Sequence, residues 1–253
     1  MIKKIKSFIY RIYIKFKEKH IMINDRDLKY LFINNKGEDL IICFSGFPAQ
    51  NDVAKYNYIK TLKKVKKKQL YILDDFGYQK KGSYYLGEYG NYFLETEIPK
   101  LISKIKQKYN IKKIYTVGTS KGGWASIYYG ILIKANVIIC GAPQYHIGDY
   151  LNTTNYHKCL LSGIIGNKEN EKEIKILNNK LSLLIQKSDL SKIKFIIHYS
   201  VNEHTYKEHI IYLLKDLKEK NAIVIENIGE YSNHNDVGKF FQQNLLKILN
   251  EER

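Results

Sequence analysis

The serine at position 120 has the surroundings that point most clearly to chemistry. In the segment VGTSKGG, Ser120 lies between Gly118 and Gly122 and fits the pattern G-x-S-x-G. A strand-like apolar stretch precedes it and a helix-like stretch follows, so the glycines permit a sharp turn that exposes the serine hydroxyl. The pattern predicts a nucleophile for acyl chemistry, although a glycine-rich turn without chemistry would use the same residues. A phosphate-binding loop is excluded, because the order G-x-x-x-x-G-K-[ST] is absent.

A nucleophilic serine needs a neighbouring base, and the base needs an acid to orient it, in the chain order serine, acid, histidine. His234 lies between the last predicted strand and the last predicted helix, where this arrangement delivers an imidazole. Taken alone, it would be interpreted as a surface-loop histidine. Glu203 follows the apolar run KFIIHYS and is the expected acid. Asp189 precedes that run, and Asp236 is too close to His234 in sequence for this role.

The oxyanion that forms when a serine attacks an acyl group needs hydrogen-bond donors. The backbone amide of Lys121 lies at the start of the helix after Ser120 and is the first expected donor. The backbone amide of Phe47, in the segment FSGFPAQ, is the expected second donor, because this loop follows the strand-like run LIICFS. A Gly-Pro turn that simply ends the strand would satisfy the same residues.

The candidate catalytic groups must be positioned by the secondary structure around them, and the sequence there consists of short apolar runs separated by amphipathic segments. They predict parallel strands buried on both faces, hence an α/β fold with a mostly parallel, doubly wound sheet. The region from about 145 to 187 breaks this rhythm and predicts a small helical lid over the carboxyl edge, where open sheets bind ligands. Strands are expected at HIMIN, LKYLFIN, LIICFS, QLYILDD, KIYTVG, NVIICGA, KFIIHYS and AIVIENI, and helices at about 53–66, 92–109, 206–219, 240–249 and directly after Ser120.

The formal net charge of the 253-residue chain is +17. A positive field attracts polyanions such as nucleic acid, anionic lipid or acidic polysaccharide, although ordinary solvated lysines give the same charge. No zinc-ligand spacing, RNA-recognition motif or basic-zipper pattern accompanies it, so we expect neither nucleic acid nor a metal as a partner. The run LKKVKKK is one candidate anion-binding surface, although a solvated helix end has the same composition.

No repeat or composition break divides the chain, which predicts a single domain over 21–253 after an N-terminal segment, 1–20. In that segment isoleucines and Phe16 recur at helical spacing among lysines, which predicts a basic amphipathic helix. Such a helix would lie on an anionic membrane face or pack on the protein's own core. Three widely spaced cysteines and the lack of a secretory signal favour the cytoplasm, with peripheral attachment to the inner membrane face if the helix binds lipid.

Four blocks of the sequence resemble a known family. These blocks, FSGFPAQNDVAKYNYIKTL, GTSKGGWASIYYG, CGAPQYHIGDYL and SNHNDVGKFF, are similar to α/β-hydrolase-fold capsular polysaccharide O-acetyltransferases of the meningococcal serogroup A type. More distantly, they resemble the hydrolase-like domain of the accessory secretion protein Asp-two. The likeness extends from about residue 40 to residue 246, and the N-terminal segment has no counterpart in it.

The resemblance implies an α/β-hydrolase fold in which Ser120 is the nucleophile, His234 the base and Glu203 the acid, where the meningococcal enzyme has aspartate. It also implies acetyl-CoA as co-substrate and an acidic or phosphate-containing polysaccharide as acceptor. Two other classes of function stay open. The first is a serine esterase, deacetylase or thioesterase, because a triad does not distinguish water from a sugar hydroxyl. The second is a non-catalytic polyanion-binding or secretion-complex component.

Overall fold

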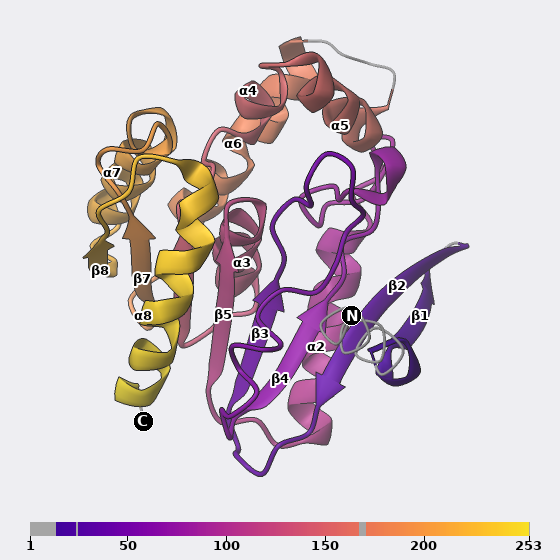
Figure 1. Cartoon of the computed structure of the whole chain (residues 1–253), viewed down its shortest axis with the longest axis vertical. Coiled ribbons are helices and arrows are strands. Elements are labelled where there is room, and N and C mark those ends of the chain that lie inside the picture. Colours follow the sequence, from indigo (N-terminus) through magenta and orange to yellow (C-terminus); the bar gives the residue numbers. More distant parts are fainter. Residues whose placement is uncertain (1–13, 24, 167–170, 253) are drawn as a thin grey trace, which may run out of the picture.

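The computed structural model describes residues 14–23, 25–166 and 171–252. Within these residues, eight strands form one twisted sheet in the order β1-β2-β4-β3-β5-β6-β7-β8 (Figure 1). The strands from β4 to β8 in this order are parallel, whereas β2 runs antiparallel to both β1 and β4. Their bounds are β1 Lys19–Ile23, β2 Arg26–Ile33, β3 Leu40–Phe44, β4 Lys68–Ile72, β5 Ile114–Thr119, β6 Val137–Gly141, β7 Lys194–Tyr199 and β8 Ile223–Ile228.

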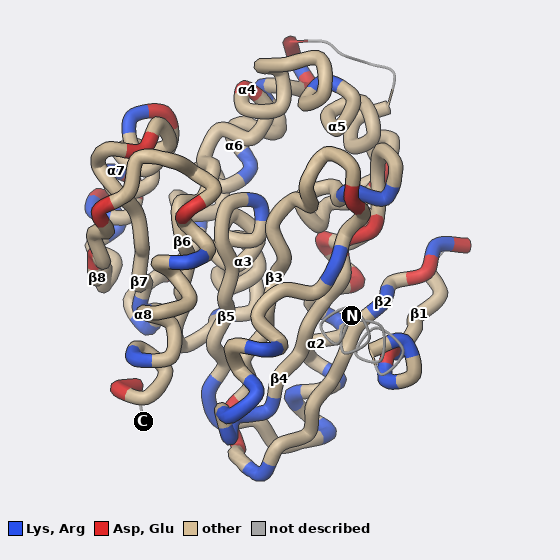
Figure 2. The backbone as a smooth tube through the Cα atoms, viewed as in Figure 1, with Lys and Arg blue, Asp and Glu red and all other residues tan. Residues whose placement is uncertain are grey.

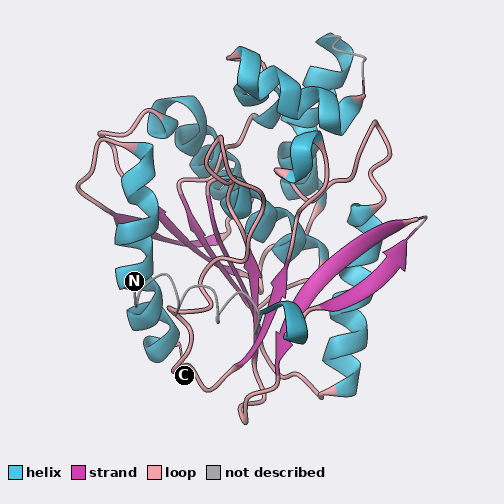
Figure 3. Ribbon diagram, turned by 45° about the vertical axis from the view of Figure 1, so that its right-hand side comes forward, coloured by secondary structure: helices cyan, strands magenta, loops and turns pink. Residues whose placement is uncertain are grey.

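Helices cover both faces of the sheet, as Figure 3 shows from a second direction. Alternate residues of each central strand point to opposite faces. On β3, Leu40, Ile42 and Phe44 join the core beneath α2, α3 and α7, whereas Ile41 and Cys43 join the core beneath α8. The helices are α2 Leu94–Lys108, α3 Lys121–Leu132, α4 Ile147–Leu151, α5 Asn155–Ile165, α6 Glu171–Lys187, α7 Ile211–Glu219 and α8 Val237–Glu251, with short helices η1 Tyr78–Lys80, η2 Tyr206–Ile210 and η3 His234–Asp236.

The fold prediction is confirmed: this is a mostly parallel α/β sheet with helices on both faces. The predicted strands correspond to β1 through β8, and the helices expected around 92–109, 206–219 and 240–249 correspond to α2, η2 with α7, and α8. The part of the chain between 145 and 187 holds α4, α5 and α6. In Figure 1, α4 and α5 lie beyond the carboxyl ends of the strands. In contrast, α6 packs beside α3 and contributes Leu177, Leu181 and Ile185 to the core on that face of the sheet. A lid function for these helices stays a prediction.

The helix expected over 53–66 is wrong, because this segment forms turns. Tyr58 has a φ of 65°, a left-handed backbone that interrupts any helix at that point. The preceding residue, Asn57, is bound instead to the end of β3: its amide donates to Ser45 Oγ at 3.1 Å, and its side-chain oxygen accepts from the Gly46 amide at 3.1 Å. Tertiary hydrogen bonds therefore replace the helical ones that the apolar spacing suggested.

The N-terminal helix predicted over 1–20 falls largely on residues 1–13, which lie outside the described part of the chain. Residues 14–17 have helical backbone geometry, and β1 already begins at Lys19. Among the described residues, none of the helices combines the length and the apolar character needed to cross a bilayer.

Charge is distributed unevenly over the fold. Figure 2 shows lysine and arginine gathered at the end of the sheet where β3, β4 and β5 begin. The lysine run 63–68 leads into the first residue of β4, whereas Ser120 follows the last residue of the parallel strand β5. The run therefore lies at the opposite end of the sheet from Ser120 and does not line a site around that serine.

Candidate active site

The turn that carries Ser120 is a sharp elbow between β5 and α3. Ser120 has φ 55° and ψ −123°, a conformation that L-residues rarely adopt. A Cβ on Gly118 would lie 2.0 Å from the carbonyl oxygen of Gly122, and a Cβ on Gly122 would lie 2.4 Å from that of Phe44. Only glycine fits at these two positions, because the strand and the helix cross too closely for a side chain. The elbow thereby presents the Ser120 hydroxyl at the carboxyl edge of the sheet.

The structure brings Ser120, His234 and Glu203 together across 114 residues of chain. His234 Nε2 lies 3.0 Å from Ser120 Oγ, and His234 Nδ1 lies 3.1 Å from Glu203 Oε1. Glu203 is delivered by the loop after β7, and His234 by the loop between β8 and α8. This is the geometry in which an imidazole accepts the serine proton while a carboxylate holds its other nitrogen.

Glu203 is buried, and its carboxylate is hydrogen-bonded on both oxygens. Oε2 accepts from the Thr205 hydroxyl, Oε1 accepts from the Thr205 amide at 3.3 Å, and His204 Nδ1 lies 2.7 Å from Oε1. Burial by itself raises the pKa of Glu203, but hydrogen bonds from His234 and Thr205 and the nearby imidazole charges outweigh it, so the net pKa lies below its ordinary value. Glu203 therefore stays ionised at neutral pH, as an orienting acid must.

The two residues whose amides are expected as oxyanion donors lie at the elbow and at the cavity wall. Lys121 is the first residue of α3, where a backbone N–H has no partner within the helix. Phe47 lies three residues beyond the end of β3 and lines the same cavity as Ser120 and His234. Their use as oxyanion donors stays a prediction of the geometry.

The cavity at the elbow has a volume of about 440 Å³. Besides the serine and His234, its walls include Phe47 from the loop after β3 and Tyr150, Tyr156 and His157 from the α4–α5 region. The described residues that line it include no lysine or arginine. The cavity therefore offers aromatic and uncharged polar side chains beside the Ser120 hydroxyl.

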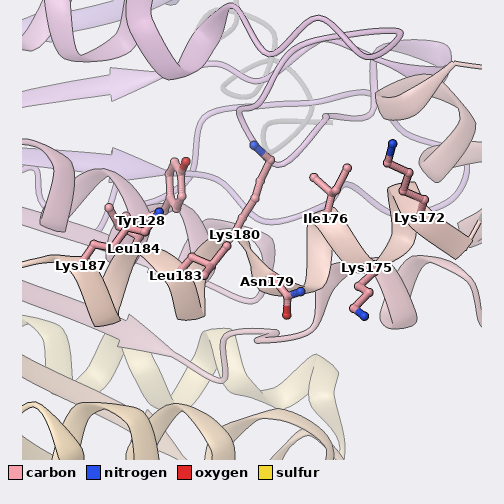
Figure 4. A pocket seen from close by; sticks show the side chains of 9 residues that line it. All are labelled: Tyr128, Lys172, Lys175, Ile176, Asn179, Lys180, Leu183, Leu184 and Lys187. Carbon is pink, nitrogen blue, oxygen red and sulfur yellow. The ribbon is translucent and has the colours of Figure 1, made fainter.

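A second cavity, of about 540 Å³, is lined by Tyr128 and residues of α6 (Figure 4). Its lining includes four lysines but neither serine nor histidine. Tyr128 lies two turns along α3 from the elbow, so this cavity is separate from Ser120 and is not the candidate active site. Among the described residues, no group of three or more histidine, cysteine, aspartate or glutamate side chains could hold a metal ion.

Sequence reasoning missed a buried ion pair beneath the elbow. Lys121 Nζ lies 2.6 Å from Asp74 Oδ2, and both side chains are almost completely buried. The same carboxylate accepts hydrogen bonds from the amides of Ser83 and Tyr85 at 2.9–3.0 Å. The ammonium also lies 5.2 Å from the centre of the Phe47 ring. The pair thus joins the elbow to the loop after β4 and to the loop that carries Phe47.

Sequence reasoning also gave no role to Gln144. Its side-chain Nε2 donates to Ser120 Oγ at 2.9 Å, and the residue is fully buried. The sequence signals were the place of Gln144 two residues after the run NVIICGA and its inclusion in the block CGAPQYHIGDYL that carries the family resemblance. A strand-end position alone does not indicate where a flexible amide side chain points.

The fold and the elbow together define a protein of the α/β-hydrolase fold. A model of the accessory Sec system GspB-transporter family, Asp-two, matches residues 24–252. The chain belongs to this family. No curated protein matches it by sequence.

Solved structures share the fold at low sequence identity. The capsule O-acetyltransferase of Neisseria meningitidis serogroup A superposes with a TM-score of 0.72 at 21% identity, over 93% of this chain and 99% of that one. A variant of that enzyme is solved in complex with CoA, at a TM-score of 0.73 and the same identity, over 92% of this chain and 94% of that one. A Glycosylation Associate Protein (Gap123) complex from Streptococcus agalactiae gives 0.70 at 18% identity, over 92% of this chain and 46% of that one. An acylaminoacyl peptidase of Pyrococcus horikoshii superposes with a TM-score of 0.66 at 13% identity, over 94% of this chain and 42% of that one.

Proposed function

We propose that this accessory Sec family protein is an acetyl-CoA-dependent O-acetyltransferase that acts on a cell-surface polysaccharide through an acetyl-Ser120 intermediate. The continuous hydrogen-bonded chain from Ser120 through His234 to the buried Glu203 carries this proposal. The fold shared with a capsule O-acetyltransferase and with an acylaminoacyl peptidase supports acyl chemistry at that chain of groups. The CoA complex of the capsule enzyme supports a CoA thioester as the acyl donor.

In the first half-reaction, His234 Nε2 takes the hydroxyl proton as Ser120 Oγ attacks the thioester carbonyl carbon. The resulting oxyanion receives hydrogen bonds from the amides of Lys121 and Phe47, each such donor contributing about 3–4 kcal/mol. The carbon–sulfur bond then breaks, and the CoA thiolate takes the proton from His234. In the second half-reaction, His234 takes the proton of a sugar hydroxyl, whose oxygen attacks acetyl-Ser120. The proton returns to Ser120 Oγ as the serine ester bond breaks.

The acceptor we propose is an acidic or phosphate-containing polysaccharide. The ring that bears the reacting hydroxyl would lie in the cavity beside Tyr150 and Tyr156, whose described lining has no lysine or arginine. The charged groups of the polymer therefore lie outside this cavity. Location at the cytoplasmic side of the membrane, with contact through residues 1–20, is part of the same proposal.

The proposal is tested by incubating the full chain with acetyl-CoA, with and without capsule-type polysaccharide, and measuring free thiol and acetylated sugar. We expect thiol release that depends on the acceptor and equals the sugar acetylation. Thiol release at the same rate with and without the acceptor would instead identify the protein as a thioesterase or esterase. Binding of polysaccharide without any thiol release would assign a non-catalytic component.

Replacing Glu203 with glutamine is expected to lower kcat by about 10²- to 10⁴-fold, because the amide no longer stabilises the imidazolium that forms at His234. Glu203→Asp is the matched control: it keeps the charge, and we expect a smaller loss. Steady-state kinetics of both variants check the assignment. Full activity of Glu203→Gln would mean that another acid orients His234.

The substitution Glu203→Gln is also expected to change the stability of the fold in a pH-dependent way. Because the pKa of Glu203 is lowered on folding, its carboxylate stabilises the fold above its ordinary pKa of 4.5, and this contribution is lost as the pH falls through the lowered value. The difference in unfolding free energy between wild type and Glu203→Gln is therefore expected to be constant near neutral pH and to shrink below pH 4.5. Urea titrations at several pH values measure it.

A further inference from the structure

The Gln144 side chain is held in one orientation behind the serine. Its Nε2 donates to Ser120 Oγ at 2.9 Å, and its Oε1 accepts from the Tyr84 hydroxyl at 3.2 Å. Gln144 and Tyr84 are both fully buried. Burial raises the pKa of Tyr84 well above its usual range, so its hydroxyl stays protonated and continues to donate. Because Tyr84 donates to the amide oxygen, the amide nitrogen faces Ser120.

The backbone just before Gln144 is strained, and it positions this residue beside Ser120. Ala142, two residues earlier, has a φ of 37°, which is unfavourable for a residue with a side chain. Two hydrogen bonds hold the chain there: the Ala142 amide donates to the His198 carbonyl at 2.8 Å, and the Ser120 amide donates to the Gly141 carbonyl at 2.8 Å. The second bond links the exit of β6 directly to the elbow, so Gln144 and Ser120 are positioned against each other.

The hydrogen bond from Gln144 determines where the serine proton points. A hydroxyl has one hydrogen to donate, and an amide NH₂ group only donates. Since Gln144 donates to Ser120 Oγ, the serine hydrogen is directed at the other close partner, His234 Nε2, 3.0 Å away. We propose that Gln144 is a further catalytic residue, which fixes the Ser120 hydroxyl toward His234 and stabilises its oxygen as the proton leaves.

The strength of this contact increases along the reaction. When His234 takes the proton, negative charge develops on Ser120 Oγ, and a hydrogen bond to a charged oxygen is roughly twice as strong as a neutral one. Gln144 is fully buried, is not among the described residues that line the cavity, and bonds to the nucleophilic oxygen itself. Its loss is therefore expected to lower kcat and leave KM nearly unchanged. The inference rests on the nucleophile of the proposed function, but not on acetyl-CoA or on the polysaccharide.

The test measures how fast a fluorophosphonate probe modifies Ser120 in the full chain, because this reaction needs only the activated serine. Gln144→Met keeps an unbranched side chain of similar length and removes the donor. We expect labelling about 10- to 100-fold slower than wild type, from the usual strength of a hydrogen bond to a charged group. Tyr84→Phe keeps the amide but frees its orientation, and we expect an intermediate rate.

Gln144→Glu separates a chemical role from a packing role. At low pH the protonated carboxyl donates to Ser120 Oγ as the amide does. Once ionised it only accepts, and it draws the serine hydrogen away from His234. The labelling rate of this variant is expected to fall as the pH rises through the pKa of the introduced carboxyl, which burial raises toward neutrality. Wild type has no such falling limb, because the Gln144 amide does not titrate and the neighbouring Tyr84 stays protonated.

Circular dichroism and thermal melts confirm that each variant is folded. A labelling rate for Gln144→Met equal to wild type, or a Gln144→Glu pH profile identical to wild type, would overturn the proposal. Absence of labelling at Ser120 in wild type would overturn it together with the proposed function. If wild type is labelled but does not turn over acetyl-CoA, the acyltransferase proposal fails alone, and slow labelling of Gln144→Met still supports this role of the amide.

Discussion

Replacing Ser120 with alanine is expected to lower acetyl transfer by a factor of roughly 10⁴ to 10⁶, to the level that binding and oxyanion stabilisation alone provide. The reason is that both half-reactions pass through acetyl-Ser120, so without this hydroxyl His234 and Glu203 have no acyl-enzyme to form or to resolve. Acceptor-dependent thiol release measures the loss. Intact-mass spectrometry adds a direct check, because an acetyl adduct is expected in wild type incubated with acetyl-CoA without acceptor and is expected to be absent from the variant.

A matched pair of substitutions at the same position separates activity from stability. Ser120→Gly is expected to be as inactive as Ser120→Ala but more stable by about 1 kcal/mol, since glycine adopts the φ of 55° at this elbow without the strain that a Cβ brings. Urea denaturation compares the two variants. Equal stability would mean that the elbow is not strained, and retained turnover by either variant would exclude Ser120 as the nucleophile.

Buried strands were the part of the fold that local sequence could predict. The runs that became β3 and β6 have no charged or amide side chain, and β4 is apolar from Leu70 onward. Every residue of these three strands is buried. The segment 53–66 shows the limit of the same reasoning, because its apolar spacing is helical. Its conformation is instead held by two hydrogen bonds to the end of β3: the Asn57 amide donates to Ser45 Oγ, and the Asn57 side-chain oxygen accepts from the Gly46 amide. Such tertiary bonds leave no periodic signal.

The residues of the candidate site likewise fall into those that the sequence could predict and those that it could not. Ser120, His234 and Glu203 could be nominated because a local motif, a loop position and a strand end each indicate them in chain order. Asp74 and Gln144 could not, because their roles depend on side chains that meet from different strands and have no shared spacing. Lys121 was nominated only for its backbone amide, and its side chain proves to be completely buried against Asp74.

Replacing Asp74 with asparagine is expected to destabilise the fold by about 3–5 kcal/mol, the largest loss of stability we predict. The substitution leaves the Lys121 ammonium buried without a counter-charge, and breaking a buried pair on one side costs this much. Burial already lowers the pKa of Lys121 below its ordinary 10.5, although Asp74 opposes this shift. In the variant the unfolded chain binds the lysine proton more readily than the folded chain, so the penalty is expected to shrink as the pH rises toward 10.5.

The double variant Asp74→Asn with Lys121→Met tests whether the pair, rather than either side chain, causes that loss. Asparagine still offers an oxygen to the amides of Ser83 and Tyr85, and methionine fills the space of the lysine stem without a charge. Removing both partners of a buried pair is often close to neutral, so we expect the double variant to recover most of the stability that Asp74→Asn loses. Its acetyl transfer should nevertheless stay below wild type, because the ammonium no longer joins the elbow to the loop that carries Phe47. A double variant as unstable as Asp74→Asn would mean that the hydrogen bonds of the Asp74 loop, and not the ion pair, hold the elbow in place.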